Sequence, residues 1–423
     1  MAEAQAKAGL EARRAAVLAM TAVTEEGRLL SEALPRLTAD LGPGDKARAN
    51  RLATGALRWA GRSDRLLGPH LRLKPEDPIL NLLRLAIFEI FVESAPEHAA
   101  VDAAVTLSSR AKAGLVNGVM RNLLRRQPVW DKTPLPGVPK WLRKRLVPAW
   151  GKGALAEMEA VFAAEPPLDL TLRNRDETET WAERLGAEIR PDGGLRLQEF
   201  RQVSNMPGFE EGAWWVQDAG ASVAARVLDV QAGAEVLDLC AAPGGKTLQL
   251  AAAGARITAL DVSKDRMARV TENLKRTGLE AETIVADALK WQPEKTFDAI
   301  LLDAPCSASG TLRRHPDLAY ARDGSGIDAL VALQAQLLSR AASWLKPGGR
   351  LVYCTCSLFP EEGEAQAKAA LSRHKSLSIV PPEGGWIDPV WATDAGTLRL
   401  RPDHWKDRGG IDGFFVAAFE KRP

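Results

Sequence analysis

The stretch that decides the fold is Val236-Leu-Asp-Leu-Cys240-Ala241-Ala242-Pro243-Gly244-Gly245-Lys246-Thr247, in which an apolar run ends in a glycine-rich turn. Glycine lets the backbone approach a ligand closely, and a helix that begins after such a turn offers unpaired amide hydrogens. The turn matches neither G-x-G-x-x-G nor G-x-x-x-x-G-K-S/T, so the patterns of dinucleotide-binding and phosphate-binding loops are both absent. We therefore expect a nucleotide-like ligand here, although the glycine pair alone also fits an ordinary turn.

Short runs rich in Leu and β-branched residues recur on either side of helical segments after residue 234. They are EVLDLC (235–240), RITALD (256–261), ETIVAD (282–287), FDAILLD (297–303) and GRLVYCTC (349–356). Such alternation is typical of a parallel, doubly wound sheet, in which ligands bind at the carboxyl ends of the strands. The sequence therefore predicts an α/β, Rossmann-like domain with its site at that edge.

Acidic side chains close the second and third of these runs. Asp261 is placed to accept hydrogen bonds from both hydroxyls of an unphosphorylated ribose, and Asp287 is placed to touch a base edge. Either carboxylate alone equally well caps a helix. Together with the glycine turn they predict a pocket for an adenosyl group. We favour S-adenosylmethionine over NAD, because no second nucleotide-binding half follows.

The last two runs each deliver a cysteine to the same edge. Cys306 follows Asp303 in the fourth run, and Cys356 ends the fifth, whereas Cys354 alternates with Cys356 and should face the other way. The chain has only one other cysteine, Cys240, so we expect reduced thiols rather than a disulfide framework. The spacing of cysteines and histidines does not fit a zinc site, and we expect no metal.

Two thiols, an acid and a methyl donor together suit methylation of cytosine. Carbon 5 of cytosine is not nucleophilic, but addition of a thiolate to carbon 6 makes carbon 5 enamine-like and able to accept a methyl group. A free thiol has a pKa of about 8.5, so the attacking cysteine needs a positive or dipolar neighbour. Lys246 is the nearest candidate.

The N-terminal part has a different pattern. Apolar residues recur at spacings of three and four, which predicts a helical bundle with helices at 14–30, 51–67, 78–92, 101–109 and 116–126. Residues 1–150 carry 24 Lys and Arg against 15 Asp and Glu, and ten of the basic residues lie between Arg110 and Arg145. This excess favours a nucleic acid as much as it favours an ordinary solvated helix face.

The predicted domains are a helical domain over 1–135, a small α+β connector over 141–215 and the catalytic domain over 216–423. The stretch 127–140 contains four prolines and indicates the first boundary. Because we see neither a membrane-spanning run nor a signal peptide, we expect a cytoplasmic protein.

Three strings, VLDLCAAPGGKT, LDAPCSASGTLRRHPD and YCTCSLFPEEGE, resemble the motifs of the RsmB/Nop2/Sun family of RNA 5-methylcytosine methyltransferases. The helical part resembles the NusB-like RNA-binding domain of the RsmB branch. The resemblance implies S-adenosylmethionine as cofactor, unassembled 16S ribosomal RNA as substrate, no membrane partner and a monomer. It also implies that Cys356 is the nucleophile and that Cys306 helps to release the product.

The same resemblance places the other predicted site residues. Cys240 to Lys246 would surround the methionine and ribose of the cofactor, with Asp261 at the ribose, Asp287 near the adenine and Asp303 between cofactor and target base. Lys246 and Asp303 are also placed to contact the cytosine. Arg313, Arg314 and His315 lie where they could reach phosphate, or form a surface turn.

Some positions depart from the family pattern. Ala308 replaces a usual glycine, Gly363 replaces a common asparagine, and Asp403 separates Pro402 from His404, which leaves the contacts of His404 open. A reaction in which the two cysteines exchange roles also fits the motifs. The sequence further leaves open transfer RNA as substrate, a non-catalytic NusB-like ribosome-assembly factor, and an oxidoreductase, which would need the missing pyrophosphate pattern.

Overall fold

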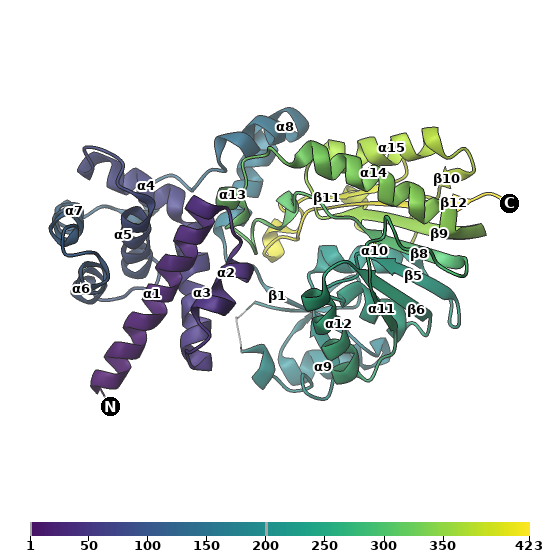
Figure 1. Cartoon of the computed structure of the whole chain (residues 1–423), viewed down its shortest axis with the longest axis horizontal. Helices are drawn as coiled ribbons and strands as arrows, with labels where there is room; N and C mark the ends of the chain where they lie inside the picture. The colour runs from purple at the N-terminus through teal and green to yellow at the C-terminus, as the bar shows by residue number, and fades with distance from the viewer. Residues whose placement is uncertain (1, 199–201) are drawn as a thin grey trace. The chain divides into compact units, whose positions relative to one another are not determined.

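The computed structural model describes residues 2–198 and 202–423, and side chains are described from residue 9 onward outside that gap (Figure 1). The chain forms two compact units. The first comprises the residues up to Ala164 together with Leu312–Gly324, and the second comprises Glu165–Thr311 and Ser325–Pro423. In the described part of the chain, no helix is both long and apolar enough to cross a membrane.

The first unit is helical and encloses its own apolar core, built around α1, α3 and α5. Gly27, with φ +67°, ends α1 earlier than the predicted helix at 14–30, and a new helix starts at Leu30. The predicted helix at 51–67 is likewise divided, at Trp59. The helices are α1 (Ala2–Glu26), α2 (Leu30–Leu37), α3 (Pro43–Arg58), α4 (Ala60–Leu67), α5 (Asp77–Phe91), α6 (Glu97–Leu107), α7 (Ala113–Arg125), α8 (Lys140–Ala163) and α13 (Leu318–Ala321).

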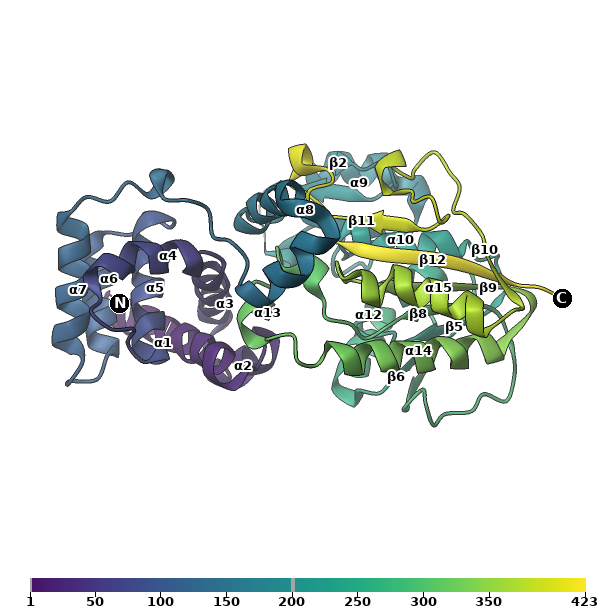
Figure 2. The same cartoon turned by 90° about the horizontal axis from the view of Figure 1, so that it is seen from above.

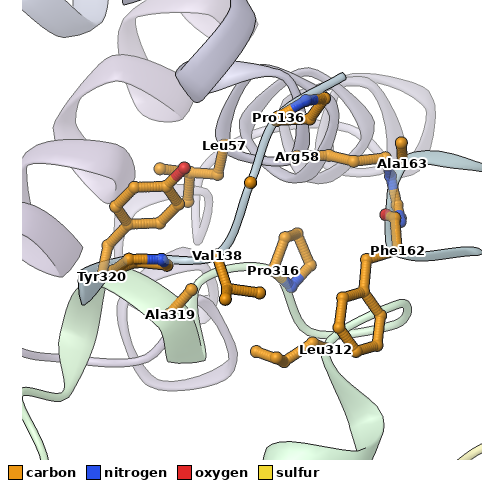
Figure 3. Close-up of a pocket in the computed structure, with 12 residues that line it drawn as sticks. Leu57, Arg58, Pro136, Val138, Phe162, Ala163, Leu312, Pro316, Ala319 and Tyr320 are labelled. Atoms are coloured by element: carbon orange, nitrogen blue, oxygen red, sulfur yellow. The ribbon is translucent and has the colours of Figure 1, made fainter. Parts of the chain in front are cut away.

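The segment Leu312–Gly324 packs into this first unit although it is distant in sequence. The carboxylate of Asp317 accepts a hydrogen bond from the amide of Leu30 at 2.9 Å, and the indole of Trp141 donates to the carbonyl of Ala319 at 3.1 Å. Figure 3 shows apolar side chains of this segment, including Leu312 and Tyr320, around a small pocket with residues of α3 and α8. The segment is thus part of the unit's packing.

The second unit begins with a small sheet in the order β2-β3-β1-β4, all antiparallel. Its strands are β1 (Leu168–Leu172), β2 (Glu188–Ile189), β3 (Leu195–Leu197) and β4 (Trp214–Val216), and α9 (Thr178–Leu185) connects the first two. β1, α9 and β3 match predicted elements. The predicted strand at 195–200 runs into 199–201, which lie outside the described residues.

The large sheet has the order β10-β12-β9-β8-β5-β6-β7, with β11 paired to β12. β7, β6, β5, β8 and β9 are parallel, as predicted, but β12 lies antiparallel to β9, so the sheet is mixed rather than wholly parallel. The strands are β5 (Glu235–Leu239), β6 (Arg256–Asp261), β7 (Glu282–Val285), β8 (Phe297–Asp303), β9 (Leu345–Thr355), β10 (Leu377–Ile379), β11 (Leu398–Leu400) and β12 (Phe414–Lys421).

Helices cover both faces of this sheet, because alternate residues of its buried strands point to opposite sides. One face packs against α14 (Ile327–Trp344) and α15 (Glu364–Arg373), and the other against α10 (Ala219–Leu228) and α11 (Gly245–Ala252). Figure 2 shows α14 and α15 on one side of β12 and α10 on the other. α12 (Lys264–Thr277) packs beside α11. This three-layer arrangement brings the carboxyl ends of β5, β6, β7, β8 and β9 to one edge.

Candidate active site

The turn after β5 brings the start of α11 to the carboxyl edge of the sheet. Cys240 and Gly244 have positive φ angles of 61° and 103°, which bend the chain between the strand and the helix. The hydroxyl of Thr247 donates to the carboxylate of Asp238 at 2.6 Å, and the amide of Ala242 donates to that of Asp261 at 3.2 Å. The predicted glycine turn is thus anchored to β5 and β6, with the amide hydrogens of the first turn of α11 at this edge.

Negative charge gathers at this edge of the sheet. Burial, followed by the charges of Asp303 and Asp261, raises the pKa of the Cys240 thiol. Burial also raises the pKa of Asp238 to about 7, and its Oδ1 atom has no hydrogen-bond partner. Asp287, which follows β7, is partly exposed and accepts a hydrogen bond from the amide of Leu289 at 2.9 Å. Such a potential suits a cationic group.

Lys246 and Asp303 form an ion pair next to the thiols. The ammonium of Lys246 lies 2.7 Å from Oδ2 of Asp303 and 5.3 Å from the centre of the Phe414 ring. Burial alone would lower the pKa of Lys246, but Asp303 and the nearby thiols raise it above its ordinary value. Lys246 is therefore positively charged at neutral pH and is a neighbour that can stabilise a thiolate.

The thiols of Cys306 and Cys356 touch each other, with their sulfur atoms 3.4 Å apart. The hydrogen bond to Cys356, followed by burial, raises the pKa of Cys306. Cys354 is buried and its sulfur lies 3.4 Å from Oδ1 of Asp303, so it does not belong to this pair. The ends of β8 and β9 thus bring together the two cysteines that the sequence singled out.

The residues that support the two cysteines were not predicted from the sequence. Glu362, Ser307, Ser357 and Gln334 form a buried hydrogen-bond network behind them. Glu362 belongs to the string PEEGE, but its role is visible only once the loops meet. The ring of Phe414 beside Lys246 also had no predicted role, because Phe414 was expected only as the start of the last strand.

Two predicted features lie elsewhere. Arg313 is fully buried, and its carbonyl accepts a hydrogen bond from Arg58 in the first unit, so an exposed surface turn or a free phosphate contact at this residue is a wrong prediction. His404 is also buried. Its Nδ1 accepts from the amide of Arg401 at 3.3 Å, and burial followed by the charge of Arg401 lowers its pKa to about 4.

A basic pocket of about 450 Å³ lies in the first unit, at the end of α7. Among the described residues, Arg72, Arg125 and Arg126 form no ion pair with a carboxylate, although all three line this pocket with His70 and Asn122. Burial and the charge of Arg126 lower the pKa of His70. Unpaired guanidinium groups around one cavity form a site for anions.

Within residues 2–198 and 202–423, no group of three or more histidine, cysteine or acidic side chains is arranged to hold a metal ion. The acids at the sheet edge are engaged with backbone amides, with Lys246 or with Thr247. The chemistry of this site therefore rests on thiols, one lysine and carboxylates.

Comparison with known proteins gives the family. Residues 225–420 match the family described as 16S rRNA methyltransferase RsmB/F, and residues 10–125 match the NusB family. A protein of Cronobacter sakazakii named ribosomal RNA small subunit methyltransferase B is 38% identical, covering 98% of this chain and 100% of that relative. The protein of the same name in Pseudomonas putida is 35% identical, covering 97% and 98%.

A solved structure named PH0851 is similar over 97% of this chain and 99% of its own, with 26% identity and a TM-score of 0.76. The predicted fold class is confirmed: a NusB-like helical region precedes a Rossmann-like methyltransferase fold. With relatives this similar over nearly its full length, the chain belongs to the 16S rRNA methyltransferase RsmB/F family.

Proposed function

We propose that this protein transfers a methyl group from S-adenosylmethionine to carbon 5 of a cytosine in 16S ribosomal RNA. The observation that carries the proposal is the contact between Cys306 and Cys356 beside the Lys246–Asp303 ion pair. Thiols that share one edge with an activating cation are suited to covalent catalysis on a pyrimidine. Membership of the family and the names of the relatives support RNA as the substrate.

The residues at the edge of the sheet fit S-adenosylmethionine. The amides at the start of α11 and the carboxylate of Asp261 would hold the ribose and the methionine part, with Asp287 near the adenine. The negative potential that raises the pKa of Cys240 favours a sulfonium cation. The cofactor supplies an electrophilic methyl group. Cys240, Ala241, Ala242, Pro243, Gly244, Gly245, Lys246 and Asp303 complete this proposed site.

In the proposed reaction, the thiolate of Cys356 donates an electron pair to carbon 6 of cytosine. Carbon 5 then gains the electron density with which it bonds to the methyl carbon. Cys306 receives the proton that leaves carbon 5, the double bond between carbons 5 and 6 re-forms, and the sulfur of Cys356 departs with its electron pair. Lys246 stabilises the thiolate, and Asp303 holds Lys246 in place.

The two cysteines are tested by separate variants. Cys356→Ala should abolish methyl transfer while cofactor binding, measured by calorimetry, is retained. Cys306→Ala should accumulate a covalent protein–RNA adduct, seen as a retarded band on a denaturing gel without added oxidant. Turnover by Cys356→Ala, or an adduct that forms only with Cys356→Ala, would show that the roles are exchanged or absent. Ser339→Ala, which removes a hydroxyl of α14 bonded to Ala335 and His374, is the control.

We infer that the basic pocket at the end of α7 contacts the RNA backbone. Charge reversal at Arg125 and Arg126 should weaken RNA binding and flatten the dependence of affinity on salt concentration, by about one logarithmic unit per contact at most. Arg121→Glu is the matched control, because Arg121 is exposed on the same helix outside the pocket. A salt dependence that changes equally in both variants would contradict a specific contact.

We propose that the enzyme acts as a cytoplasmic monomer on 16S RNA before subunit assembly, when unpaired cytosines are accessible. Its proposed domains are 1–135, 141–215 and 216–423. Purified 16S RNA should be methylated faster than assembled small subunits, and bisulfite sequencing of RNA from cells with and without the gene should locate the cytosine. Equal methylation of both, or modified transfer RNA instead, would contradict this substrate.

A further inference from the structure

Glu362 is a fully buried carboxylate between the two loops that carry the cysteines. It ends the short 3-10 turn Pro360–Glu362, just before α15. Its Oε1 accepts hydrogen bonds from the amide of Ser307 at 2.9 Å and from the side-chain amide of Gln334 at 3.0 Å. Its Oε2 accepts from the hydroxyl of Ser357 at 2.5 Å.

Both serines are the immediate neighbours of a thiol. Ser307 follows Cys306 and Ser357 follows Cys356, so each oxygen of Glu362 holds one cysteine loop. The two serine hydroxyls lie 3.1 Å apart, and that of Ser309 lies within hydrogen-bond distance of both. The carboxylate therefore connects the loops directly.

Further contacts fix Glu362 itself. Its backbone carbonyl accepts hydrogen bonds from the hydroxyl of Tyr353 at 2.7 Å and from that of Thr355 at 3.2 Å, both on β9. Gln334 of α14 also donates to the carbonyl of Pro305 at 2.9 Å, just before Cys306. Since the strand, the helix and both loops meet at this residue, its position determines how the loops are spaced.

The charge of Glu362 has no ion-pair partner among the described residues. Arg399, which is close by, instead contacts the carboxylate of Glu364 and the carbonyl of Ser357. Burying a carboxylate is costly unless several donors compensate it, and here they are an amide N–H, a side-chain amide and a hydroxyl. The negative charge also contributes to the raised pKa of Cys306, after the hydrogen bond to Cys356 and burial.

We propose that Glu362 is a positioning residue that holds the Cys306 and Cys356 loops so that their sulfur atoms stay in contact. This inference rests on the proposed function, in which the two thiols act in turn on one cytosine ring. It also assigns a second effect to the carboxylate: its charge disfavours ionisation of Cys306, which keeps the release residue protonated while Cys356 attacks. The proton on Cys306 then has to leave before Cys306 can accept the one from carbon 5.

Three variants separate these effects. Glu362→Ala removes both hydrogen-bonding arms, Ser357→Ala removes the arm to the Cys356 loop, and Glu362→Gln keeps the shape but removes the charge. We expect Glu362→Ala to lower kcat by about tenfold to a hundredfold, since small misplacement of reacting groups has effects of this size. The KM for RNA and the affinity for S-adenosylmethionine should stay within about twofold. Ser357→Ala should lower kcat less, and Ser339→Ala should leave it unchanged.

The charge effect has a readout that does not need RNA. Alkylation of Cys306 by iodoacetamide, followed peptide by peptide with mass spectrometry, should shift to lower pH in Glu362→Gln than in the unaltered protein. A change in folding alone would not produce this shift with unchanged cofactor affinity. An unshifted alkylation profile in Glu362→Gln, or a normal kcat in a folded Glu362→Ala, overturns the inference.

The outcomes distinguish this inference from the proposed function. If Cys356→Ala is inactive and the Glu362 variants behave normally, only the positioning role fails. If Cys356→Ala retains turnover, the proposed function fails, whatever the alkylation profile of Glu362→Gln. If Glu362→Ala does not fold, Ser357→Ala and the Glu362→Gln profile still decide the question.

Discussion

Asp238 is a carboxyl group buried at the end of β5, beneath the proposed active site. One of its oxygens accepts the hydroxyl of Thr247, and the other has no partner. Burial raises its pKa from the ordinary 3.8 to about 7, although Thr247 and Lys246 oppose the shift. The folded protein therefore binds this proton more tightly than the unfolded chain does.

This shift predicts how stability depends on pH. Below about pH 4 the carboxyl is protonated in both states, and between pH 4 and pH 7 only the unfolded chain releases the proton, so the free energy of unfolding falls as pH rises. Relative to the unaltered protein, Asp238→Asn should gain on the order of 2–4 kcal/mol between pH 4 and pH 8. Urea unfolding at both pH values measures this gain.

The exposed Asp229→Asn is the control for this experiment, because Asp229 lies in the same unit and is 75% exposed in its side chain. Its curve should follow that of the unaltered protein. Equal pH dependence in Asp238→Asn and the unaltered protein would show that Asp238 titrates normally.

Single residues of the site were predictable where a simple geometric rule applies. Cys306 and Asp303 follow β8 and Cys356 follows β9, and because parallel strands end at one edge, their proximity follows from the pattern of runs. Glu362 obeys no such rule. It lies in a short turn, and its contacts with two loops depend on the packing of β9 and α14, which no local pattern encodes.

At the scale of elements, the small sheet is joined to the chain before β12 by one buried ion pair. Arg196 of β3 forms two hydrogen bonds of 2.7 Å with Asp169 of β1, and its third nitrogen donates to the carbonyls of Arg408 and Gly410. Both side chains are at most 2% exposed. The pair therefore links β1, β3 and the loop that precedes the last strand.

Removing one partner of this pair should be strongly destabilising. Asp169→Asn or Arg196→Met leaves an uncompensated buried group, and we expect a loss of about 3–5 kcal/mol in the free energy of unfolding. The double variant Asp169→Asn/Arg196→Met should lose less than the sum of the two single losses. Thermal unfolding of the three variants measures the coupling, and strictly additive losses would contradict the assigned interaction.

Elements with strong periodic patterns were predictable, and short ones were not. The runs at 235–240, 256–261, 282–287, 297–303 and 349–356 form β5 to β9, because buried parallel strands are continuously apolar. β4, β10 and β11 have three residues each, too few to show a period. The prediction of a wholly parallel sheet was wrong because β12 follows β9 through α15 and β10 and returns antiparallel, a reversal that hydrophobicity does not reveal.

At the scale of the whole molecule, the first compact unit is built from two separate parts of the chain. Leu312 and Leu318 are buried in it, and Asp317 and Ala319 accept hydrogen bonds from Leu30 and Trp141. The sequence predicts a continuous N-terminal helical region, and nothing in the string LRRHPDLAYARDG indicates that it belongs there. Membership depends on complementary surfaces that only the folded chain presents.

This arrangement predicts that residues 165–423 produced alone will aggregate. The segment 312–324 would lose its partners and expose Leu312, Leu318 and Tyr320 to water. Replacing 312–324 by a glycine–serine linker of equal length should restore the yield of monomer, measured by gel filtration after expression. A monomeric, folded 165–423 fragment with the native segment would contradict this expectation.

The same discontinuity sets an order of events during synthesis. When residue 164 has left the ribosome, the helical unit still lacks the piece that covers its pocket, and about 160 more residues must be translated before Gly324 emerges. At typical rates of chain elongation this interval lasts roughly ten to thirty seconds. For that time the nascent helices carry an uncovered apolar surface, which makes them a natural client for a ribosome-associated chaperone.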